Sequence, residues 1–330
     1  MPSSSQYSIQ RGDDMSIYAY GNSEKCKMEI NEDSYAVKKI GDYIVLIVAD
    51  GNGGSKGMIN VGGMAVSTML DYLTHMINPN TSIIDIFNQI EAGLFTVSRC
   101  FLAMNAIDER YSNIYASMTV GIIEEISLNA VFASIGNTEV KLIRNGEITR
   151  INKLFSEAYD SYMKGEISEE ELYFHPKRAI LTSALGVFNE AKVDVMKMQL
   201  LKEDILLLET DGIYCCMPPQ RMIEILANNG DNINVAVDKI LQTAKDEDCQ
   251  DNCTLICSYI YNDNSISTTR GYTPREQYMP QKEQQYNQYD TPMVNREGKG
   301  RENAREEMYQ SDDVYRPTTK KKKKSYMYNM

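Results

Sequence analysis

Acidic residues adjoin several apolar segments of this 330-residue chain, in positions that could bind a cation. Three of them border apolar runs that we expect to be strands, and two more lie together just before a shorter alternating segment. In chain order these residues are Glu32, Asp33, Asp50, Asp211 and Asp251. Carboxylates held close together repel one another unless a cation neutralises them, so a cluster of these residues predicts a divalent metal site. The residues alone leave open a second interpretation, in which each Asp-Gly pair forms an ordinary turn.

The available ligand types restrict which metal such a site could hold. The chain has 2 histidines, His75 and His175, and hard oxygen ligands without imidazole or thiolate favour Mg²⁺ or Mn²⁺. Its 7 cysteines are scattered without paired spacing, which favours reduced thiols over disulfides. Cys249, Cys253 and Cys257 recur at four-residue steps, but the last two fall in an apolar alternating stretch where cysteine acts as a small hydrophobe. We therefore do not expect a zinc site there.

A framework of strands and helices must bring these acidic residues together. The run Tyr43–Ala49 is apolar and rich in β-branched residues, and it stops at Asp50-Gly51, which indicates a buried strand that ends in a turn. Apolar residues at steps of three and four then predict two long helices, over about 59–77 and 82–108. Four further strands are predicted over 116–123, 128–135, 139–144 and 147–151, with a two-residue hairpin turn at Asn145-Gly146.

The second half of the sequence returns to strands after a polar interruption. Residues 156–177 are polar, helix-prone and poor in apolar positions, so we expect a surface excursion. The run 204–209 then repeats the pattern of an apolar strand before Asp-Gly, two helices follow over about 219–227 and 234–245, and a last strand covers 254–260. This order predicts an α+β fold with two antiparallel sheets and helices outside them.

Charge and hydropathy exclude several classes of function. Residues 263–330 carry 13 of the 34 basic and 10 of the 46 acidic residues, so residues 1–262 carry 21 against 36 and are strongly acidic. An acidic body without a basic stripe argues against nucleic acid as a ligand. We find no apolar run long enough for a membrane span, and residues 1–10 are polar and unlike a secretory signal. We therefore expect a cytoplasmic protein.

The segment after about residue 262 has a different composition from the rest of the chain. Gln, Asn, Tyr, Arg and Glu replace periodic aliphatic residues over 263–330, and the segment ends in the lysine run 320–324. Such a segment cannot bury enough apolar surface to offset its ordering entropy, so we predict a disordered Tyr/Gln-rich tail. A solubilising tail and a tail that recruits a protein partner are both open, as is an interaction protein whose main function lies in this tail.

Five short motifs, taken together, resemble the successive motifs of the PPM (type 2C) metal-dependent serine/threonine protein phosphatases, in the form of a bacterial member. They are Asn31-Glu-Asp-Ser34, Val48-Ala-Asp-Gly-Asn-Gly-Gly54, Leu181-Thr-Ser-Ala-Leu-Gly186, Thr210-Asp-Gly212 and Asp251-Asn-Cys-Thr254. The resemblance implies a phosphatase domain over 17–262, after an N-terminal extension over 1–16 and before the tail over 263–330. It also implies a central β-sandwich flanked by helices on both sides, and it likens the excursion around 165–176 to the flap that this family has beside its active site.

The same resemblance implies a two-metal centre with either Mn²⁺ or Mg²⁺ and the hydrolysis of phosphoserine and phosphothreonine by a metal-bridged water. By position, Asp50 would bridge both ions, and the Gly51 carbonyl and Glu32, through water, would complete the shell of one. Asp211 and Asp251 would hold the other ion, and Asp33 would support the cluster. The catalytic residues would thus be Asp50 and Asp211. The substrates would be phosphoproteins, and we expect a monomer.

Departures from the family pattern affect substrate binding and the central strands. Met28 stands where the family usually has a phosphate-binding arginine, which leaves Lys27 as a candidate phosphate ligand. The Gly-Asp of the central strands is Gly136-Asn137, and a carboxylate that many members hold for a third metal is missing from 112–116. A catalytically weak PPM-like binding or regulatory module is therefore the alternative to an active phosphatase.

Overall fold

The computed structural model describes residues 15–53, 59–187, 191–230 and 232–262. The predicted tail lies outside the described residues, as does almost all of the predicted N-terminal extension. In the described part, ten strands form two antiparallel sheets of five strands each. The first sheet has the order β1, β10, β9, β6, β7, formed by Met15–Glu24, Cys253–Asn262, Ile205–Glu209, Glu139–Arg144 and Glu147–Arg150. The second has the order β2, β3, β4, β5, β8, formed by Ser34–Ile40, Tyr43–Asn52, Tyr115–Glu124, Asn129–Ile135 and Asp194–Gln199.

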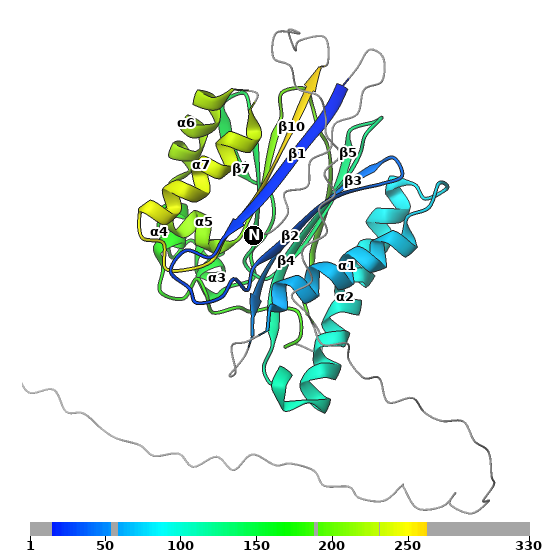
Figure 1. Cartoon of the computed structure of the whole chain (residues 1–330), viewed down its shortest axis with the longest axis vertical. Coiled ribbons are helices and arrows are strands. Elements are labelled where there is room, and N and C mark those ends of the chain that lie inside the picture. The colour runs from blue at the N-terminus through cyan, green and yellow to red at the C-terminus, as the bar shows by residue number, and fades with distance from the viewer. Residues whose placement is uncertain (1–14, 54–58, 188–190, 231, 263–330) are drawn as a thin grey trace, which may run out of the picture. The chain divides into compact units, whose positions relative to one another are not determined.

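Helices cover the outer faces of the two sheets, which confirms the predicted fold class. Helices α1 (Val61–Met76) and α2 (Ile83–Ile107) pack on the second sheet, and α6 (Pro219–Asn229) and α7 (Ile233–Asp246) pack on the first (Figure 1). The hydrophobic core accordingly has three layers, one under each helix pair and one between the sheets. A sandwich of this kind buries both faces of its inner strands.

Strand β3 shows how the sequence meets this demand. Its side chains alternate, because Ile44, Leu46 and Val48 belong to the core between the sheets. Val45 and Ile47, which point the opposite way, belong to the core beneath α1 and α2. A strand buried on both faces is continuously apolar, which explains the uninterrupted run that made this segment recognisable in the sequence.

The structure corrects the expectation that both Asp-Gly pairs lie in turns. Strand β3 continues through Asp50 and Gly51 to Asn52, paired with β4 throughout. Asp211 and Gly212 instead begin the short helix α5 (Asp211–Cys216). Strands β1 and β8 and helix α5 were not predicted, since β1 and β8 alternate weakly and α5 is too short to show a periodicity.

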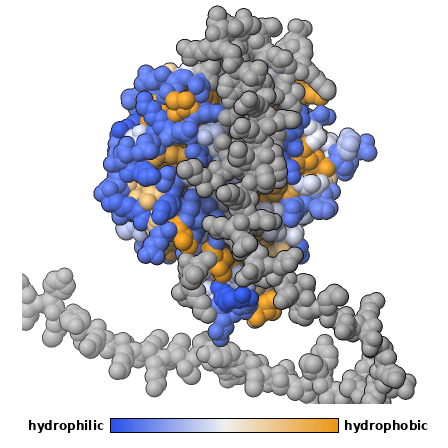
Figure 2. All heavy atoms as spheres, viewed as in Figure 1, coloured by the Kyte–Doolittle hydropathy of each residue, from blue (hydrophilic) through white to orange (hydrophobic). Residues whose placement is uncertain are grey.

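Helix α2 combines a strong start signal with an unusually apolar composition. Ser82 and Asp85 form a capping box, which satisfies free backbone N–H groups at the helix start. By length and composition alone α2 could cross a membrane. In this fold, however, Ile86, Ile90 and Leu94 are fully buried in the core beneath the helix pair, so its composition has a structural cause. Figure 2 shows that hydrophilic residues dominate the described surface on one face of the molecule, interrupted by small hydrophobic patches.

The polar excursion contains two short helices, α3 (Glu157–Met163) and α4 (Glu169–Phe174). The sequence predicted helices here but few core positions. Leu154, Ala158, Tyr159 and Leu172 nevertheless form a small hydrophobic cluster of their own. The excursion is therefore a packed substructure with a minor core, attached to the sandwich by backbone hydrogen bonds such as Thr182 N to Phe155 O at 2.8 Å.

Candidate active site

Asp50 occupies the centre of the predicted cluster. It lies in β3 directly opposite Ser117 of β4, so two paired strands fix its backbone. Burial raises the pKa of Asp50 well above its usual range, and the negative charges of Asp211, Asp33, Asp251 and Glu32 raise it further. The residues predicted from the sequence as one site therefore do lie close enough to interact electrostatically.

Glycines at this end of β3 allow Glu32 and the start of α1 to approach the strand. A Cβ atom at Gly51 would lie 2.3 Å from the Gly62 N atom and 2.7 Å from the Glu32 carbonyl oxygen. Glu32 uses this space, because its carbonyl accepts a hydrogen bond from Gly62 N at 3.0 Å and its Oε1 accepts one from Gly53 N. The Asp-Gly motif thus serves close backbone packing within a strand and not a turn.

Asp33 is the most firmly held of the carboxylates. It is 4% exposed, and its Oδ2 accepts hydrogen bonds from Thr210 Oγ1 at 2.7 Å and Thr254 Oγ1 at 2.8 Å. Burial raises its pKa to about 8, against the opposing effect of these two hydrogen bonds. Asp33 therefore joins the β2 segment to β9 and β10 at the edge of the site, which suits the supporting role implied for it.

Asp211 begins α5, and its carboxylate is held by hydrogen bonds that lead back to the central strands. Its Oδ2 accepts a hydrogen bond from Asn137 Nδ2 at 3.0 Å, and Asn137 Oδ1 in turn accepts one from Ser117 Oγ at 2.7 Å. Burial and then the charge of Asp251 raise the pKa of Asp211 to about 7, while Arg178 and Asn137 lower it. The side-chain amide of Asn137 thus donates a hydrogen bond to Asp211. An aspartate at position 137 would instead repel Asp211.

The segment before β10 places Asp251 and connects it to the rest of the site. Asn252 accepts a hydrogen bond from Glu32 N at 2.9 Å and donates to the Ile30 carbonyl at 3.0 Å. A Cβ atom at Gly212 would lie 1.9 Å from the Asn252 carbonyl oxygen, so only glycine permits this packing of α5. Burial raises the pKa of Asp251 as well.

The donor set fits hard divalent cations. Within the described ranges, none of the five carboxylates forms an ion pair with a lysine or arginine. Burial is the main cause of their raised pKa values, and in Glu32, Asp33, Asp50 and Asp211 the charge of neighbouring carboxylates, which a bound cation would offset, adds to it. No three of the described carboxylates bring their oxygens within 4.8 Å of one another. These carboxylates therefore do not form one compact group of oxygens.

A cleft of about 360 Å³ opens beside Asp211 and Asp251. Arg178, which sequence reasoning missed, lines it and is a cation close enough to lower the pKa values of both aspartates. Nothing in the sequence around residue 178 marks this role, because the chain reaches the cleft only through the fold of the excursion. Lys27, the predicted phosphate ligand, is exposed, and its Nζ lies 2.6 Å from Asp248 Oδ2.

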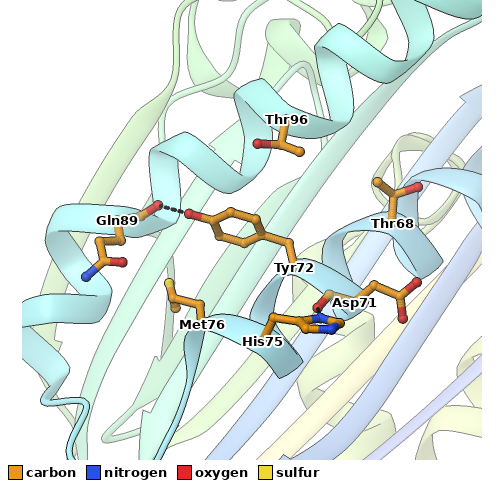
Figure 3. A pocket seen from close by; sticks show the side chains of 7 residues that line it. All are labelled: Thr68, Asp71, Tyr72, His75, Met76, Gln89 and Thr96. Carbon is orange, nitrogen blue, oxygen red and sulfur yellow. Dashed lines mark hydrogen bonds between the residues drawn. The ribbon is translucent and has the colours of Figure 1, made fainter.

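A larger hollow of about 490 Å³ lies between α1 and α2, away from the carboxylates. Figure 3 shows Tyr72 of α1 pointing toward Gln89 of α2, with Met76 and Thr96 nearby, whereas His75 lies beside Asp71 of its own helix. The Tyr72 hydroxyl donates to the Gln89 carbonyl at 3.2 Å, and His75 Nδ1 contacts the Asp71 carbonyl of its own helix at 2.7 Å. The Tyr72 contact joins the two helices, whereas the His75 contact lies within α1.

Comparison with known proteins agrees with this geometry. No family model matches the chain. The serine/threonine phosphatase stp of Listeria monocytogenes is 24% identical over 230 residues, which are 68% of this chain and 88% of that protein. Among solved structures, the serine/threonine phosphatase of S. agalactiae has a TM-score of 0.65 at 19% identity, covering 74% of this chain and 99% of that one. The catalytic domain of the phosphatase PstP, solved with 2 manganese ions, has a TM-score of 0.62 at 18% identity over 75% of this chain and 99% of that one.

These likenesses define the class of the protein. The chain has the fold of the PPM phosphatases, an α+β sandwich with helices on both sides. Its sequence resembles the bacterial serine/threonine phosphatases of that type over most of their length.

Proposed function

We propose that this protein is a metal-dependent serine/threonine protein phosphatase that hydrolyses phosphoserine and phosphothreonine in other proteins. The observation that carries the proposal is the cluster of five carboxylates around Asp50, which has raised pKa values and no paired lysine or arginine among the described residues. A fold does not by itself imply an activity, so the chemistry of this cluster bears the argument.

The carboxylates would hold two Mn²⁺ or Mg²⁺ ions, with Asp50 shared between them. Glu32 and the Gly51 carbonyl would serve one ion, and Asp211 and Asp251 the other. When bound, such ions lower the pKa of water and offset negative charge on phosphoryl oxygens. The manganese ions in the PstP structure support the choice of metal.

The other residues of the site position these ligands. Thr210 and Thr254 orient Asp33, and Asn137 orients Asp211, by the hydrogen bonds described above. Outer hydrogen bonds of this kind fix the direction of a ligand's lone pairs and contribute to metal affinity. Arg178 would attract the phosphate of a substrate into the cleft, because it is the cation that faces Asp211 and Asp251 there.

An assay of the full chain on p-nitrophenyl phosphate and on a phosphothreonine peptide tests the proposal. Both substrates should be hydrolysed with Mn²⁺ or Mg²⁺ and left intact in EDTA, and the Asp50→Asn variant should be inactive under all conditions. Tight Mn²⁺ binding without turnover of either substrate would overturn the proposal. That result would favour the catalytically weak PPM-like module, for which the methionine at position 28 is the specific motive.

A further inference from the structure

Four cysteines from distant parts of the sequence converge beside the carboxylate cluster. Cys26 follows β1, Cys216 ends α5, Cys249 follows α7, and Cys253 begins β10. The sulfur atoms of Cys26, Cys249 and Cys253 all lie within 4.8 Å of one another. Cys249 and Cys253 are the nearest pair, with sulfurs 3.3 Å apart. Cys216 lies nearby, because its thiol and that of Cys249 both donate to the Gly212 carbonyl.

These thiols lie in or against the hydrophobic core beneath α6 and α7, and they are also close to one another. Cys249 and Cys253 are 6% and 0% exposed, and Cys26 and Cys216 are half-buried. Beyond the apolar packing that a core cysteine makes, the sulfurs of Cys216, Cys249 and Cys253 also contact backbone carbonyls, and Cys249 and Cys253 contact one another. Cys257, which shares their four-residue spacing, lies deeper in β10 and belongs to no such group among the described residues.

The backbone is bent into uncommon conformations to bring the thiols together. Cys26 has a φ of 49°, and Asp248, which precedes Cys249, has a φ of 68°. The left-handed region is disfavoured for a residue with a side chain. Strain of this kind persists where the surrounding structure over-determines it, and it is concentrated at functional sites.

We propose that Cys26, Cys249 and Cys253, with Cys216 as the fourth ligand, bind one Zn²⁺ ion. Zinc holds thiolates at about 2.3 Å in a tetrahedron, which places the sulfurs about 3.8 Å apart. The three mutually close sulfurs already lie near that separation. Binding would displace the thiol protons to solvent, and no oxidation is involved. The thiol cluster would select a soft metal, whereas the neighbouring carboxylates select a hard one.

A zinc ion there would brace the segments that carry the candidate active site. The Gly212 carbonyl accepts hydrogen bonds from Cys216 at 2.7 Å and from Cys249 at 3.3 Å. Gly212 follows Asp211, and Asp251 lies between Cys249 and Cys253 in the sequence. The ion would thus join α5, the start of β10 and the loop after β1. Its role is structural, and it does not depend on the phosphatase activity.

The test measures zinc in the full-length chain purified under reducing conditions from zinc-supplemented medium. We expect about one zinc per chain that is released when an organomercurial blocks the thiols, followed with a zinc-sensitive dye. Replacement by Co²⁺ should give the charge-transfer absorption of cobalt bound to thiolates. Both signals should persist in Asp50→Asn, which alters only the carboxylate centre, and in Cys100→Ser, which removes an exposed cysteine on α2.

Cys26→Ser is the decisive variant, because Cys26 is half-buried in a loop and its replacement leaves the core intact. It should lose the thiol-released zinc, bind Co²⁺ without charge-transfer absorption, and melt at the temperature of the zinc-stripped wild-type chain. Wild-type protein without thiol-released zinc would overturn the proposal, as would a Cys249–Cys253 disulfide found by mass spectrometry under the same reducing conditions. Retention of zinc by Cys26→Ser would overturn the assignment of this ligand set.

Discussion

Two groups of carboxylates lie close together in this protein, one fully buried and one that ranges from buried Asp33 to exposed Asp251, and their charges are balanced in different ways. Glu209 at the end of β9 belongs to one group, and Asp211, two residues further along, belongs to the other. Glu139 and Glu209 are fully buried, as is Lys141 between them at 2% exposure. The carboxylates around Asp50 have no such partner among the described residues.

The Glu139–Glu209 group is neutralised by the chain's own cations. Lys141 Nζ lies 3.0 Å from Glu139 Oε2 and also pairs with Glu209. Arg150 approaches Glu139 at 3.4 Å. Two carboxylates thus face two cations, and the rings of Tyr173 and Tyr214 face Lys141 at 5.3 and 5.7 Å. A buried ion group of this kind is tolerated because its charges balance, although Oε2 of each glutamate lacks a hydrogen-bond partner.

The difference indicates what each group is for. Burial raises the pKa of Glu209 to about 6, but Lys141 opposes this effect, so the chain itself holds the charge. Around Asp50, burial and like charges act together to raise the pKa, and the balancing charge must come from outside the chain. The first group is a structural element, and the second is the group that we propose as a binding site for cations.

The largest expected effect is the loss of turnover in Asp50→Asn. The substitution removes the shared anionic ligand but no core packing, so turnover should fall by more than the roughly 10–100-fold that loss of an outer partner of a ligand costs. In EDTA the variant should melt no lower than the wild-type chain, because it relieves repulsion. Initial rates with Mn²⁺ and melts by circular dichroism measure both effects. Near-wild-type turnover would show that Asp50 is not a metal ligand.

Lys141→Met should produce the opposite pattern, with a large loss of stability. Two buried glutamates would keep a single cation, and breaking a buried ion group in this way costs about 3–5 kcal/mol. The loss should be equal with Mn²⁺ and with EDTA, since the group binds no metal. Adding Glu209→Gln to the same variant should recover a large part of the stability in denaturant titrations. An unchanged unfolding free energy in the single variant would contradict the view that Lys141 balances this group.

The metal-free protein should lose stability as the pH rises from about 4 to about 8. Burial raises the pKa of Asp33 to about 8 and that of Asp211 to about 7, from 3.8. Across this window the unfolded chain releases protons that the folded chain retains, so ionisation favours unfolding until the folded groups also ionise. Melts in EDTA across this range measure the slope. Asp50→Asn should flatten it, and Mn²⁺ should stabilise most at the alkaline end; a wild-type slope equal to that of the variant would argue against uncompensated charge.

Much of the fold could be predicted because its strands are buried on both faces. The apolar runs that became β3, β9 and β10 are visible without any structure, and the Asn145-Gly146 hairpin has the positive φ values that its sequence indicated. The acidic residues were recognisable because they interrupt or adjoin such runs. The sequence did not reveal that Asp50 lies within a strand or that Asp211 begins a helix, because Asp-Gly is also a common turn signal.

Contacts between distant segments account for what the sequence could not reveal. Arg178 reaches the cleft through the folded excursion, and the balance of Lys141 against two glutamates depends on the pairing of β6 with β9. The thiol group joins residues more than two hundred positions apart, such as Cys26 and Cys249. The regular spacing of Cys249, Cys253 and Cys257 gave no sign of Cys26 or Cys216. Local patterns predict elements, whereas these groupings depend on the topology of the sandwich.

A smaller effect is expected from the cation that faces the acidic site. Arg178→Ala should raise KM for p-nitrophenyl phosphate and leave kcat measurable, because binding common to the ground and transition states is lost. A charge-assisted hydrogen bond contributes about 1.5–3 kcal/mol, which corresponds to roughly tenfold or somewhat more in kcat/KM. Arg178→Lys should recover only part of the loss, since an ammonium group cannot make paired hydrogen bonds to a phosphate. Equal KM values in the wild type, Arg178→Ala and Arg178→Lys would show that Arg178 does not bind the substrate phosphate.

The smallest effect concerns Lys27 and Met28, on the loop after β1. Lys27 pairs with Asp248, and its side chain is 48% exposed, so solvent screens its charge. If Arg178 supplies the phosphate contact, Lys27→Ala should change KM by no more than the neighbouring control Lys25→Ala.

Met28→Arg adds a guanidinium to this loop and should lower KM only when Arg178 is absent. The double variant with Arg178→Ala therefore tests whether the two positions substitute for one another. A large rise of KM in Lys27→Ala alone would show instead that this loop binds the phosphate, and that the Asp248 pair gives way when substrate arrives.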